Sequence, residues 1–302
     1  MTLMELIESG TTRFTDANIA FGHGTTNARD EATWLVLWAL GLPLDTSLEG
    51  QDSKANEPVA PVDSERCAIL FEARITTRKP AAYLTHEAWL QGVSFYVDER
   101  VIVPRSLIAE LMADGSLDYW LCETTQTVLD LCSGNGSLAI LAALTYPEVV
   151  VTASDLSTDA LAVARINVDR HELQSRITLV ESDGLAAADL QAHGPFDLIL
   201  CNPPYVNANS MAQLPPEYRA EPALALDGGS DGMDFIRTLL QAAPTHMAPG
   251  AVLVLEVGNE RHHFEAAFPH LEVVWLETSA GDDQVLVVTR LALEHFSLQQ
   301  EQ

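Results

Sequence analysis

The tetrapeptide Asn202-Pro203-Pro204-Tyr205 is the most specific chemical signal in the sequence. Two successive prolines fix two φ angles and remove two N–H donors, which leaves rigid carbonyl acceptors nearby. The Asn202 amide oxygen and the Pro203 carbonyl can each accept one N–H of a planar NH₂ group, so that its nitrogen lone pair faces an incoming electrophile. Tyr205 can stack on the flat face of that group. A proline-rich turn with a buried tyrosine is the alternative.

These properties assign two overlapping roles to the tetrapeptide. We predict three catalytic residues, Asn202, Pro203 and Tyr205. We predict that all four residues, Asn202, Pro203, Pro204 and Tyr205, bind the substrate. A substrate held by acceptors carries a neutral nitrogen group, so no histidine base is required.

The turn Asp130-Leu131-Cys132-Ser133-Gly134-Asn135-Gly136 is a second candidate site. It connects a predicted strand to an apolar helix, where glycines let the backbone turn tightly and let a ligand approach. Cys132 replaces the first glycine of the dinucleotide-binding pattern and the third glycine is absent, which disfavours NAD. We expect the turn to tolerate this small side chain. A glycine turn that binds no ligand is the alternative.

Two further acids follow the next predicted strands. Asp155 lies 25 residues after Asp130, about where adenosine-binding sheets place an acid for ribose hydroxyls. Asp183 follows the third strand and offers an acceptor for an adenine amino group, although a solvated loop aspartate is nearly as plausible alone. The predicted cofactor-binding residues are Asp130, Cys132, Gly134, Gly136, Asp155, Leu156, Asp183, Gly184 and Asn202.

The elements that must position these residues alternate between apolar strands and helices, which predicts an α/β fold with helices on both faces of a parallel sheet. Strands are predicted to begin at Thr127, Val149, Ile177, Phe196, Ala251, Val273 and Val285, and helices at Ser137, Ser157, Asp231 and Glu260. Residues 279–282 are too few for a crossover helix, so one of the last two strands must be antiparallel. A sheet of about seven strands is expected.

The residues before this sheet have a different pattern. Apolar residues recur at helical spacing between Leu3 and Leu42, and a further helix is predicted from Val62 to Thr76. Short aromatic and β-branched segments, including 95–97 and 101–103, predict a hairpin linker, after which Pro104 and Ser106 open another helix. The predicted domains are 1–81, helical; 82–104, the linker; and 105–302, the sheet domain.

Composition restricts the possible partners. The chain has 43 acidic and 16 basic residues, a formal net charge of -27, without a Lys/Arg run. Direct nucleic-acid binding is therefore not expected, because such binding needs a basic surface. A basic protein partner fits this charge through electrostatic steering, and solubility or a saline habitat explains it equally well.

Cysteine and histidine usage indicates neither a zinc site nor a disulfide framework. The four cysteines, Cys67, Cys122, Cys132 and Cys201, form no C-x-x-C pair. His23 and the pair His262-His263 lack a third ligand at useful spacing, so we predict surface or packing roles and no metal. Neither a signal peptide nor a long apolar run is evident, which predicts a soluble, cytoplasmic protein.

Together, the glycine turn, Asp155 and the Asn-Pro-Pro-Tyr loop resemble S-adenosylmethionine methyltransferases of exocyclic amino or amide nitrogens. That group includes DNA adenine and protein glutamine enzymes. The resemblance implies S-adenosylmethionine as cofactor and a Rossmann-like methyltransferase domain over 105–302. Residues 83–85 and 104–110 look like the HemK/PrmC-like glutamine N5-methyltransferase pattern. Arg105 and Glu110 are then expected to bind substrate at the pocket mouth, unless they form an ordinary ion pair at the helix start.

Four segments resemble the enzymes of this family that methylate a glutamine of the third large-subunit ribosomal protein: 21–25, 95–100, 217–219 and 256–259. The sister enzymes of release factors lack the Gly-His-Gly-Thr segment and have a proline-arginine motif one residue shorter. The expected activity is methyl transfer to glutamine N5 of that basic ribosomal protein, in ribosome assembly. Release-factor glutamine methylation, DNA adenine-N6 methylation and a non-enzymatic assembly factor are the alternatives.

The N-terminal helical domain is expected to recognise the protein substrate. Trp34 and Trp38 lie four residues apart on one predicted helix. Such a pair is more typical of a core than of an interface.

Overall fold

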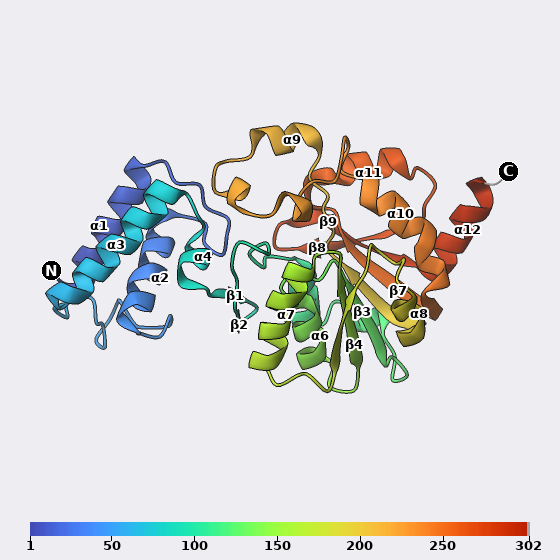
Figure 1. Cartoon of the computed structure of the whole chain (residues 1–302), viewed down its shortest axis with the longest axis horizontal. Coiled ribbons are helices and arrows are strands. Elements are labelled where there is room, and N and C mark those ends of the chain that lie inside the picture. Colours follow the sequence, from blue (N-terminus) through green and yellow to red (C-terminus); the bar gives the residue numbers. More distant parts are fainter. Residues whose placement is uncertain (301–302) are drawn as a thin grey trace.

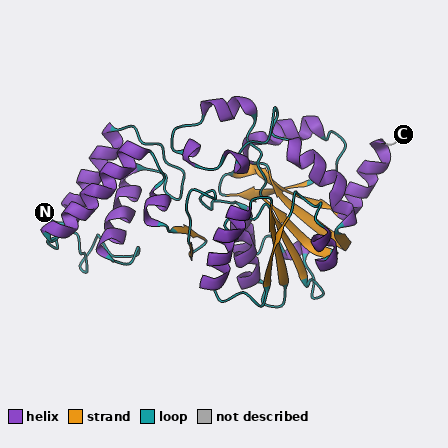
Figure 2. Cartoon of the chain, in the orientation of Figure 1, coloured by secondary structure: helices purple, strands orange, loops and turns teal. Residues whose placement is uncertain are grey.

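The computed structural model describes residues 1–300, and a seven-stranded mixed sheet lies at the centre of its larger part (Figures 1 and 2). The strands are β3 (Thr127–Leu131), β4 (Val150–Asp155), β5 (Ile177–Glu181), β6 (Phe196–Cys201), β7 (Met247–Glu256), β8 (Val274–Thr278) and β9 (Gly281–Thr289). Their order is β5-β4-β3-β6-β7-β9-β8. The first five are parallel, and β9 is antiparallel to both of its neighbours. The predicted fold class is confirmed.

Helices cover both faces of this sheet. One face packs against α5 (Ile108–Ala113), α6 (Ser137–Thr145) and α7 (Thr158–Arg170). The other packs against α8 (Ala188–His193), α10 (Asp234–Ala242), α11 (Arg261–Ala267) and α12 (Arg290–Gln300). Strand β6 shows why both are needed: Leu198 and Leu200 belong to one buried cluster, while Ile199 and Cys201 belong to the other. Alternate side chains of a strand point to opposite faces, so a strand with apolar residues on both faces must be covered on both.

The N-terminal helices are α1 (Leu3–Asp16), α2 (Ala28–Leu40), α3 (Pro61–Thr77) and the short α4 (Ala81–Thr85). A capping box between Thr2 and Glu5 begins α1, and the Asn27 side chain caps α2. Their apolar side chains form a third cluster, which also includes Ala160 and Val163 of α7. The N-terminal helices therefore share a core with the sheet-covering layer.

The predicted hairpin of the linker is present around Gly92, between α4 and α5, but residues 101–103 do not belong to it. Only β1 (Ala88–Leu90) and β2 (Val93–Phe95) pair, and the expected strand at 101–103 is a buried loop. Its backbone groups bond to side chains instead of a partner strand: Val103 N–H donates to Glu221, and the Val101 carbonyl accepts from the Tyr83 hydroxyl. β-branched residues predicted a strand, but long-range side-chain partners replaced the ladder.

Several predicted boundaries shift by a few residues. Strand β7 begins at Met247 rather than Ala251, and β9 at Gly281 rather than Val285. The β8–β9 pairing continues to Thr278 opposite Gly281, so the turn contains only Ser279 and Ala280. Helices α10 and α11 begin at Asp234 and Arg261, close to the expected positions.

One long excursion separates β6 from α10. We call residues 206–227 the bridging loop; it contains α9 (Ala208–Gln213) and the 3-10 turns η2 (Tyr218–Ala220) and η3 (Ala223–Ala225). Its ends meet in a bridge between Val206 and Asp227. Figure 1 shows it extending from the sheet toward the N-terminal helices. The remaining 3-10 turns are η1 (Asp118–Trp120), η4 (Ala243–Thr245) and η5 (Gly258–Glu260). No helix within residues 1–300 is long and apolar enough to span a membrane.

We predict that Gly10→Ala destabilises the protein although alanine favours helices. A Cβ at this position in α1 would lie 2.6 Å from a ring carbon of buried Phe71 and 3.0 Å from the Ala32 Cβ. Overpacking costs about 1–3 kcal/mol, which exceeds a helix-propensity gain of up to about 1 kcal/mol. Urea unfolding should show this loss of free energy.

Ser9→Ala in the same helix is the matched control and should be close to neutral. Adding Phe71→Leu to Gly10→Ala should recover part of the lost stability, because it removes ring atoms from the clash. A Gly10→Ala protein as stable as the wild type would contradict this account of the packing between α1 and α3.

Candidate active site

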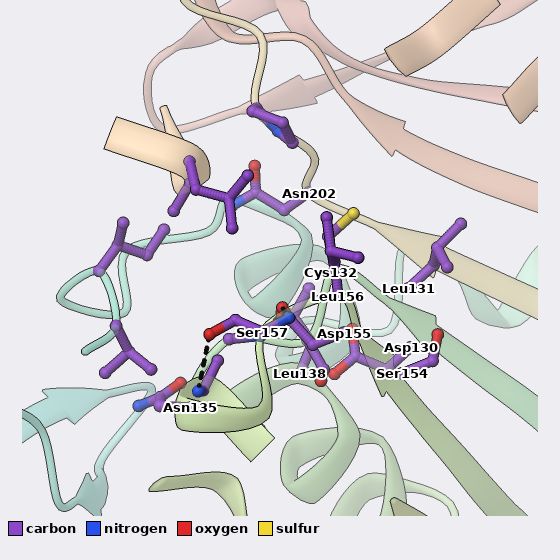
Figure 3. Close-up of a pocket in the computed structure, with 18 of the residues that line it drawn as sticks. Asp130, Leu131, Cys132, Asn135, Leu138, Ser154, Asp155, Leu156, Ser157 and Asn202 are labelled. Carbon is purple, nitrogen blue, oxygen red and sulfur yellow. Dashed lines mark hydrogen bonds between the residues drawn. The ribbon is translucent and has the colours of Figure 1, made fainter. Parts of the chain in front are cut away.

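A cavity opens at the carboxyl ends of β3, β4, β5 and β6, where each strand passes into a loop (Figure 3). It is bordered by the glycine turn, the loops after β4 and β5, the Asn202 loop and the segment 100–106. Parallel sheets bind ligands at this edge, where adjoining connections diverge. Predicted site residues that line it are Arg105, Asp130, Cys132, Gly134, Asp155, Leu156, Asp183, Gly184, Asn202 and Pro204. Four others are not lining residues: Glu110, Gly136, Pro203 and Tyr205.

The glycine turn is fixed by bonds to neighbouring elements. Gly134 N–H donates to the Asp155 carboxylate at 2.8 Å, and Ser133 N–H donates to the Ser154 carbonyl at 3.0 Å. Cys132 adopts φ +61°, the left-handed region, and is half-buried beside the cavity. A small side chain is thus present in a conformation that glycine adopts more readily. Gly136 caps α6 and supports the turn from behind.

Asn167 of α7 connects this turn to the linker. Its buried side chain donates to the Asn135 carbonyl at 2.9 Å and to the Tyr96 carbonyl at 3.0 Å, and it accepts from Tyr96 N–H at 2.7 Å. One amide therefore satisfies three backbone groups from two segments. The position of the glycine turn depends on the linker as well as on the sheet.

Asp130 and Asp155 lie close together at the base of the cavity. Burial raises the pKa of Asp130 to about 8, an effect that the Asp155 charge increases and the Ala139 N–H bond opposes. Burial also raises the pKa of Asp155, while its bonds to Ser157 and Gly134 N–H oppose that rise. A bound positive group would favour the ionised carboxylates, so the pair fits a cationic ligand.

Polar atoms around the cavity lack protein partners. Among residues 1–300, four buried side-chain atoms at its wall form no hydrogen bond: Asp130 Oδ1, Ser133 Oγ, Asn135 Nδ2 and Ser154 Oγ. Buried polar groups are normally paired, and each unpaired one costs about 1–3 kcal/mol. The wall therefore fits a ligand that carries several donors and acceptors, as a nucleoside with an amino-acid tail does.

The Asn202 loop enters the cavity from β6. Asn202 is half-buried, and its side chain bonds to none of the other residues described, so its amide oxygen is available to a ligand. In the view of Figure 3 Asn202 lies above Cys132 and Leu156, and Asp155 and Ser157 lie below them. Pro203 is buried behind this edge. The loop thus brings a free amide to the glycine turn.

Tyr205 holds the loop from behind. Its hydroxyl donates to Glu256 Oε1 at 3.3 Å, and its ring lies so close to Gly258 that a Cβ there would be 2.5 Å from a ring carbon. The φ of Gly258 is +52°, so glycine is required for both space and conformation. Burial, followed by the charge of Glu256, raises the pKa of Tyr205. The tyrosine remains a neutral donor.

Glu256 joins two sides of the cavity. Its other carboxylate oxygen accepts from Ser106 Oγ at 2.6 Å and from Leu107 N–H at 2.9 Å. The segment that carries Arg105 is therefore tied to the loop that carries Asn202 through one buried acid. Segment 256–259 is part of the family resemblance, but no pattern in the sequence predicted a structural role for Glu256.

Arg105 is held by Glu221 of the bridging loop. Two guanidinium nitrogens donate to the two carboxylate oxygens at 2.7 and 2.8 Å, and Val103 N–H donates at 2.9 Å. His23 Nε2 lies 3.4 Å from the same carboxylate, whose side chain is 0% exposed. Although burial opposes it, His23 and Arg105 lower the pKa of Glu221 to about 2. The carboxylate is ionised and fixes Arg105 against the cavity.

A second buried glutamate makes a parallel connection. Glu217 accepts from Arg78 at 3.0 Å and lies 3.6 Å from Arg74, which donates to Glu31 at 2.7 Å. Arg74 and Glu31 are fully buried. The bridging loop is thus bound to the N-terminal helices by charge-assisted bonds.

Other predicted residues lie elsewhere. Glu110 accepts from Ser279 N–H and its hydroxyl in the β8–β9 turn, so the structure brings it neither to the cavity nor to Arg105. The alternative prediction of an ion pair between Arg105 and Glu110 is therefore wrong, because Arg105 pairs with Glu221. Of the histidines, His23 is buried beside Tyr218, while His263 bonds to Glu260. No group of three His, Cys, Asp or Glu side chains within residues 1–300 could hold a metal.

Sequence comparison finds close relatives along nearly the whole chain. The Methyltransferase small domain family matches residues 110–214. The ribosomal protein uL3 glutamine methyltransferase of Bordetella pertussis is 51% identical over 96% of this chain and 95% of the relative. A protein of the same name from Burkholderia pseudomallei is 50% identical over 95% and 94%. A third protein of this name, from Bradyrhizobium diazoefficiens, is 42% identical over 97% of this chain and 92% of the relative.

Solved structures of other proteins are similar to this chain in fold alone. The hMettl16 catalytic domain in complex with MAT2A 3'UTR hairpin 1 is 13% identical, with a TM-score of 0.51, and covers 84% of this chain and 89% of that chain. The same domain in complex with hairpin 6 is 13% identical, with a TM-score of 0.50, and covers 75% of this chain and 80% of that chain. At such identity the likeness supports the sheet architecture and nothing about the ligand.

We predict that Glu221→Gln lowers the free energy of unfolding by about 3 kcal/mol at pH 7.5, because it leaves Arg105 and His23 without their buried carboxylate. The folded pKa of Glu221, about 2, lies below its ordinary value of 4.5. Its contribution is therefore present above pH 4.5 and is lost as the pH falls toward 2. Urea unfolding at pH 7.5 and pH 3 should show wild type and variant converging in acid.

Glu72→Gln is the matched control, since Glu72 pairs with Arg13 on the surface and its side chain is 63% exposed. An exposed pair contributes about 0–1 kcal/mol, so this variant should remain near wild type at both pH values. Equal effects of the two substitutions would contradict the role assigned to Glu221.

Proposed function

The chain belongs to the ribosomal protein uL3 glutamine methyltransferases, and on this premise we propose how its cavity acts. The protein transfers a methyl group from S-adenosylmethionine to the side-chain amide N5 of a glutamine in uL3, the third large-subunit ribosomal protein. The observation that carries the proposal for the site is the free Asn202 amide beside the glycine turn in one cavity.

The residues for the cofactor are those at the ends of β3, β4 and β5. The pair Asp130 and Asp155, with the unpartnered polar atoms of the turn, suits a ligand that carries positive charge and several hydroxyl and amino groups. Asp183, Gly184 and the half-exposed Leu156 border the same cavity and suit the base. S-adenosylmethionine, when bound, supplies an electrophilic methyl group on a sulfonium centre.

Asn202 and Pro203 act on the glutamine amide. Its nitrogen is a poor nucleophile because the lone pair is delocalised into the carbonyl. The Asn202 side-chain oxygen and the Pro203 carbonyl accept its two N–H groups and hold the lone pair toward the methyl donor. Positive charge develops on nitrogen as the carbon–nitrogen bond forms and the carbon–sulfur bond of the donor breaks, and these fixed dipoles stabilise the transition state more than the ground state. The methylated amide becomes neutral when one of its N–H protons leaves to solvent.

The surrounding residues keep this arrangement fixed. Pro204 lines the glutamine site, and Tyr205 supports the loop from outside the cavity with its hydroxyl fixed on Glu256. Arg105, fixed on Glu221, contacts the substrate at the cavity wall. Because these groups already have their partners, little reorganisation is needed when the substrate enters.

Protein recognition is assigned to the N-terminal region. We assign residues 1–81 to substrate recognition, 82–104 to the linker and 105–302 to methyl transfer, in the cytoplasm. The net charge of -27 favours a basic protein acceptor. The buried bonds from Glu217 and Glu221 support this division of labour, because they hold the N-terminal helices beside the active-site cavity.

The direct test is mass spectrometry of purified uL3 and of release factor, each incubated with the protein and S-adenosylmethionine. We expect a single methyl group on one glutamine of uL3 and none on the release factor. Methylation of the release factor alone would replace the proposed substrate, and transfer to neither would overturn the proposal.

Asn202→Ala should lower the single-turnover rate by about 100-fold or more, because it removes one of two acceptors for the substrate amide. Cofactor affinity, measured by calorimetry, should change little. Asp155→Ala is the reciprocal variant: it removes the acceptor for Gly134 and Ser157 N–H, so the dissociation constant of the cofactor should rise about tenfold or more. Wild-type turnover in Asn202→Ala would rule out the role of Asn202.

A further inference from the structure

A second cavity lies on the N-terminal side of the molecule. It is enclosed by the turn containing His23 and Gly24, by the side of α2 that carries Asp30, Trp34 and Leu37, and by Trp89 of β1. None of these residues lines the active-site cavity. His23, Gly24 and Thr25 therefore form part of the wall of a cavity that is separate from the active site.

Two buried nitrogen-bearing side chains in this wall are unpaired. Trp34 is 8% exposed, and its Nε1–H has no acceptor among residues 1–300. His23 is 1% exposed; Nε2 is near Glu221 only at 3.4 Å, and Nδ1 has no partner among the same residues. An indole N–H can only donate, so Trp34 requires an acceptor from outside the fold. Leaving such groups unpaired costs about 1–3 kcal/mol each, which a ligand can recover.

The rest of the wall determines the kind of ligand. Leu37 is buried, whereas Trp89 is 43% exposed and Leu44 42% exposed. The Trp89 indole N–H donates to Glu87 at 2.6 Å, which restrains the ring. Asp30 is exposed, and no lysine or arginine lines the cavity. The Asp30 carboxylate accepts from the Asn27 side chain at 2.7 Å and forms no ion pair with the other residues in 1–300. An aromatic face, aliphatic contacts and this carboxylate together suit a long basic side chain.

We propose that this cavity binds a short segment of the methyl-accepting protein, with one lysine or arginine side chain placed between Trp89 and Asp30. A backbone carbonyl of the same segment accepts the Trp34 Nε1–H. The inference rests on the proposed function, since the ligand is part of the protein substrate. The net charge of -27 supports a basic partner over an acidic or nucleic-acid one.

His23 places this cavity next to the catalytic one. It borders the second cavity and lies 3.4 Å from Glu221, which holds Arg105 at the wall of the first. Three side chains in contact, His23, Glu221 and Arg105, thus run from the wall of the second cavity to the wall of the first. One substrate chain can occupy both, so the second cavity acts as a specificity determinant that selects which glutamine-bearing protein is methylated.

The test is steady-state methyl transfer to purified uL3 by Trp34→Phe, Trp89→Ala and Asp30→Asn. Trp34→Phe keeps the ring but removes the N–H, so it tests the hydrogen bond with little risk to folding. We expect each variant to raise KM for uL3 by about tenfold, with unchanged kcat and unchanged cofactor affinity, since the catalytic cavity is intact. The effect of Asp30→Asn should shrink in high salt.

Tyr119→Ala and Asp45→Asn are matched controls at exposed positions outside the cavity, and their KM values should stay at the wild-type level. If KM stays unchanged in all three cavity variants, the inference is overturned while the proposed function stands. If wild-type protein transfers no methyl group to uL3, the proposed function fails first. A fall in kcat without a change in KM would also overturn the inference, because it would indicate a structural role.

Discussion

The buried carboxylate of Glu221 is the interaction on which the rest of the arrangement depends. It bonds to Arg105 and Val103 from the cavity wall and lies beside His23 from the N-terminal turn. A fully buried charge is costly unless it is compensated on several sides. Here the compensation comes from two segments distant in sequence, 103–105 and the turn that contains His23, so the carboxylate is stable only when both are correctly placed.

The other contacts extend from this centre in two directions. Toward the sheet, Glu256 connects the Arg105 segment to Tyr205, while Asn167 connects the linker to the glycine turn. Toward the N-terminal helices, Glu217 of the bridging loop forms ion pairs with Arg74 and Arg78. Reactive groups are thus positioned mainly by buried side chains that do not border the cavity themselves. Such support is needed where a small error in geometry would slow the reaction.

Sequence reasoning predicted the sheet well because its signals are local. Alternating strands and helices, the glycine turn and the Asn202 loop lie within short windows, and Asp155 follows from the end of its own strand. Glu221, Glu256 and Asn167 could not be found in that way, because their hydrogen-bond partners lie 32 to 150 residues away. The only signal available was that acids occur next to the recognised segments. The prediction that residues 101–103 form a strand was wrong for the same reason, since Val103 N–H donates to Glu221 instead of to a partner strand.

The core shared by the N-terminal helices and α7 has a consequence for protein engineering. Val163 of α7 packs in the same cluster as Leu35 and Phe71 of the N-terminal helices, and α7 also covers the sheet. Removing residues 1–81 would take Leu35 and Phe71 out of this apolar cluster. It would also leave Glu217 without Arg74 and Arg78, and Glu221 without His23. Grafting a different recognition module onto the sheet therefore requires redesign of α7 and the bridging loop, rather than a simple exchange at the linker.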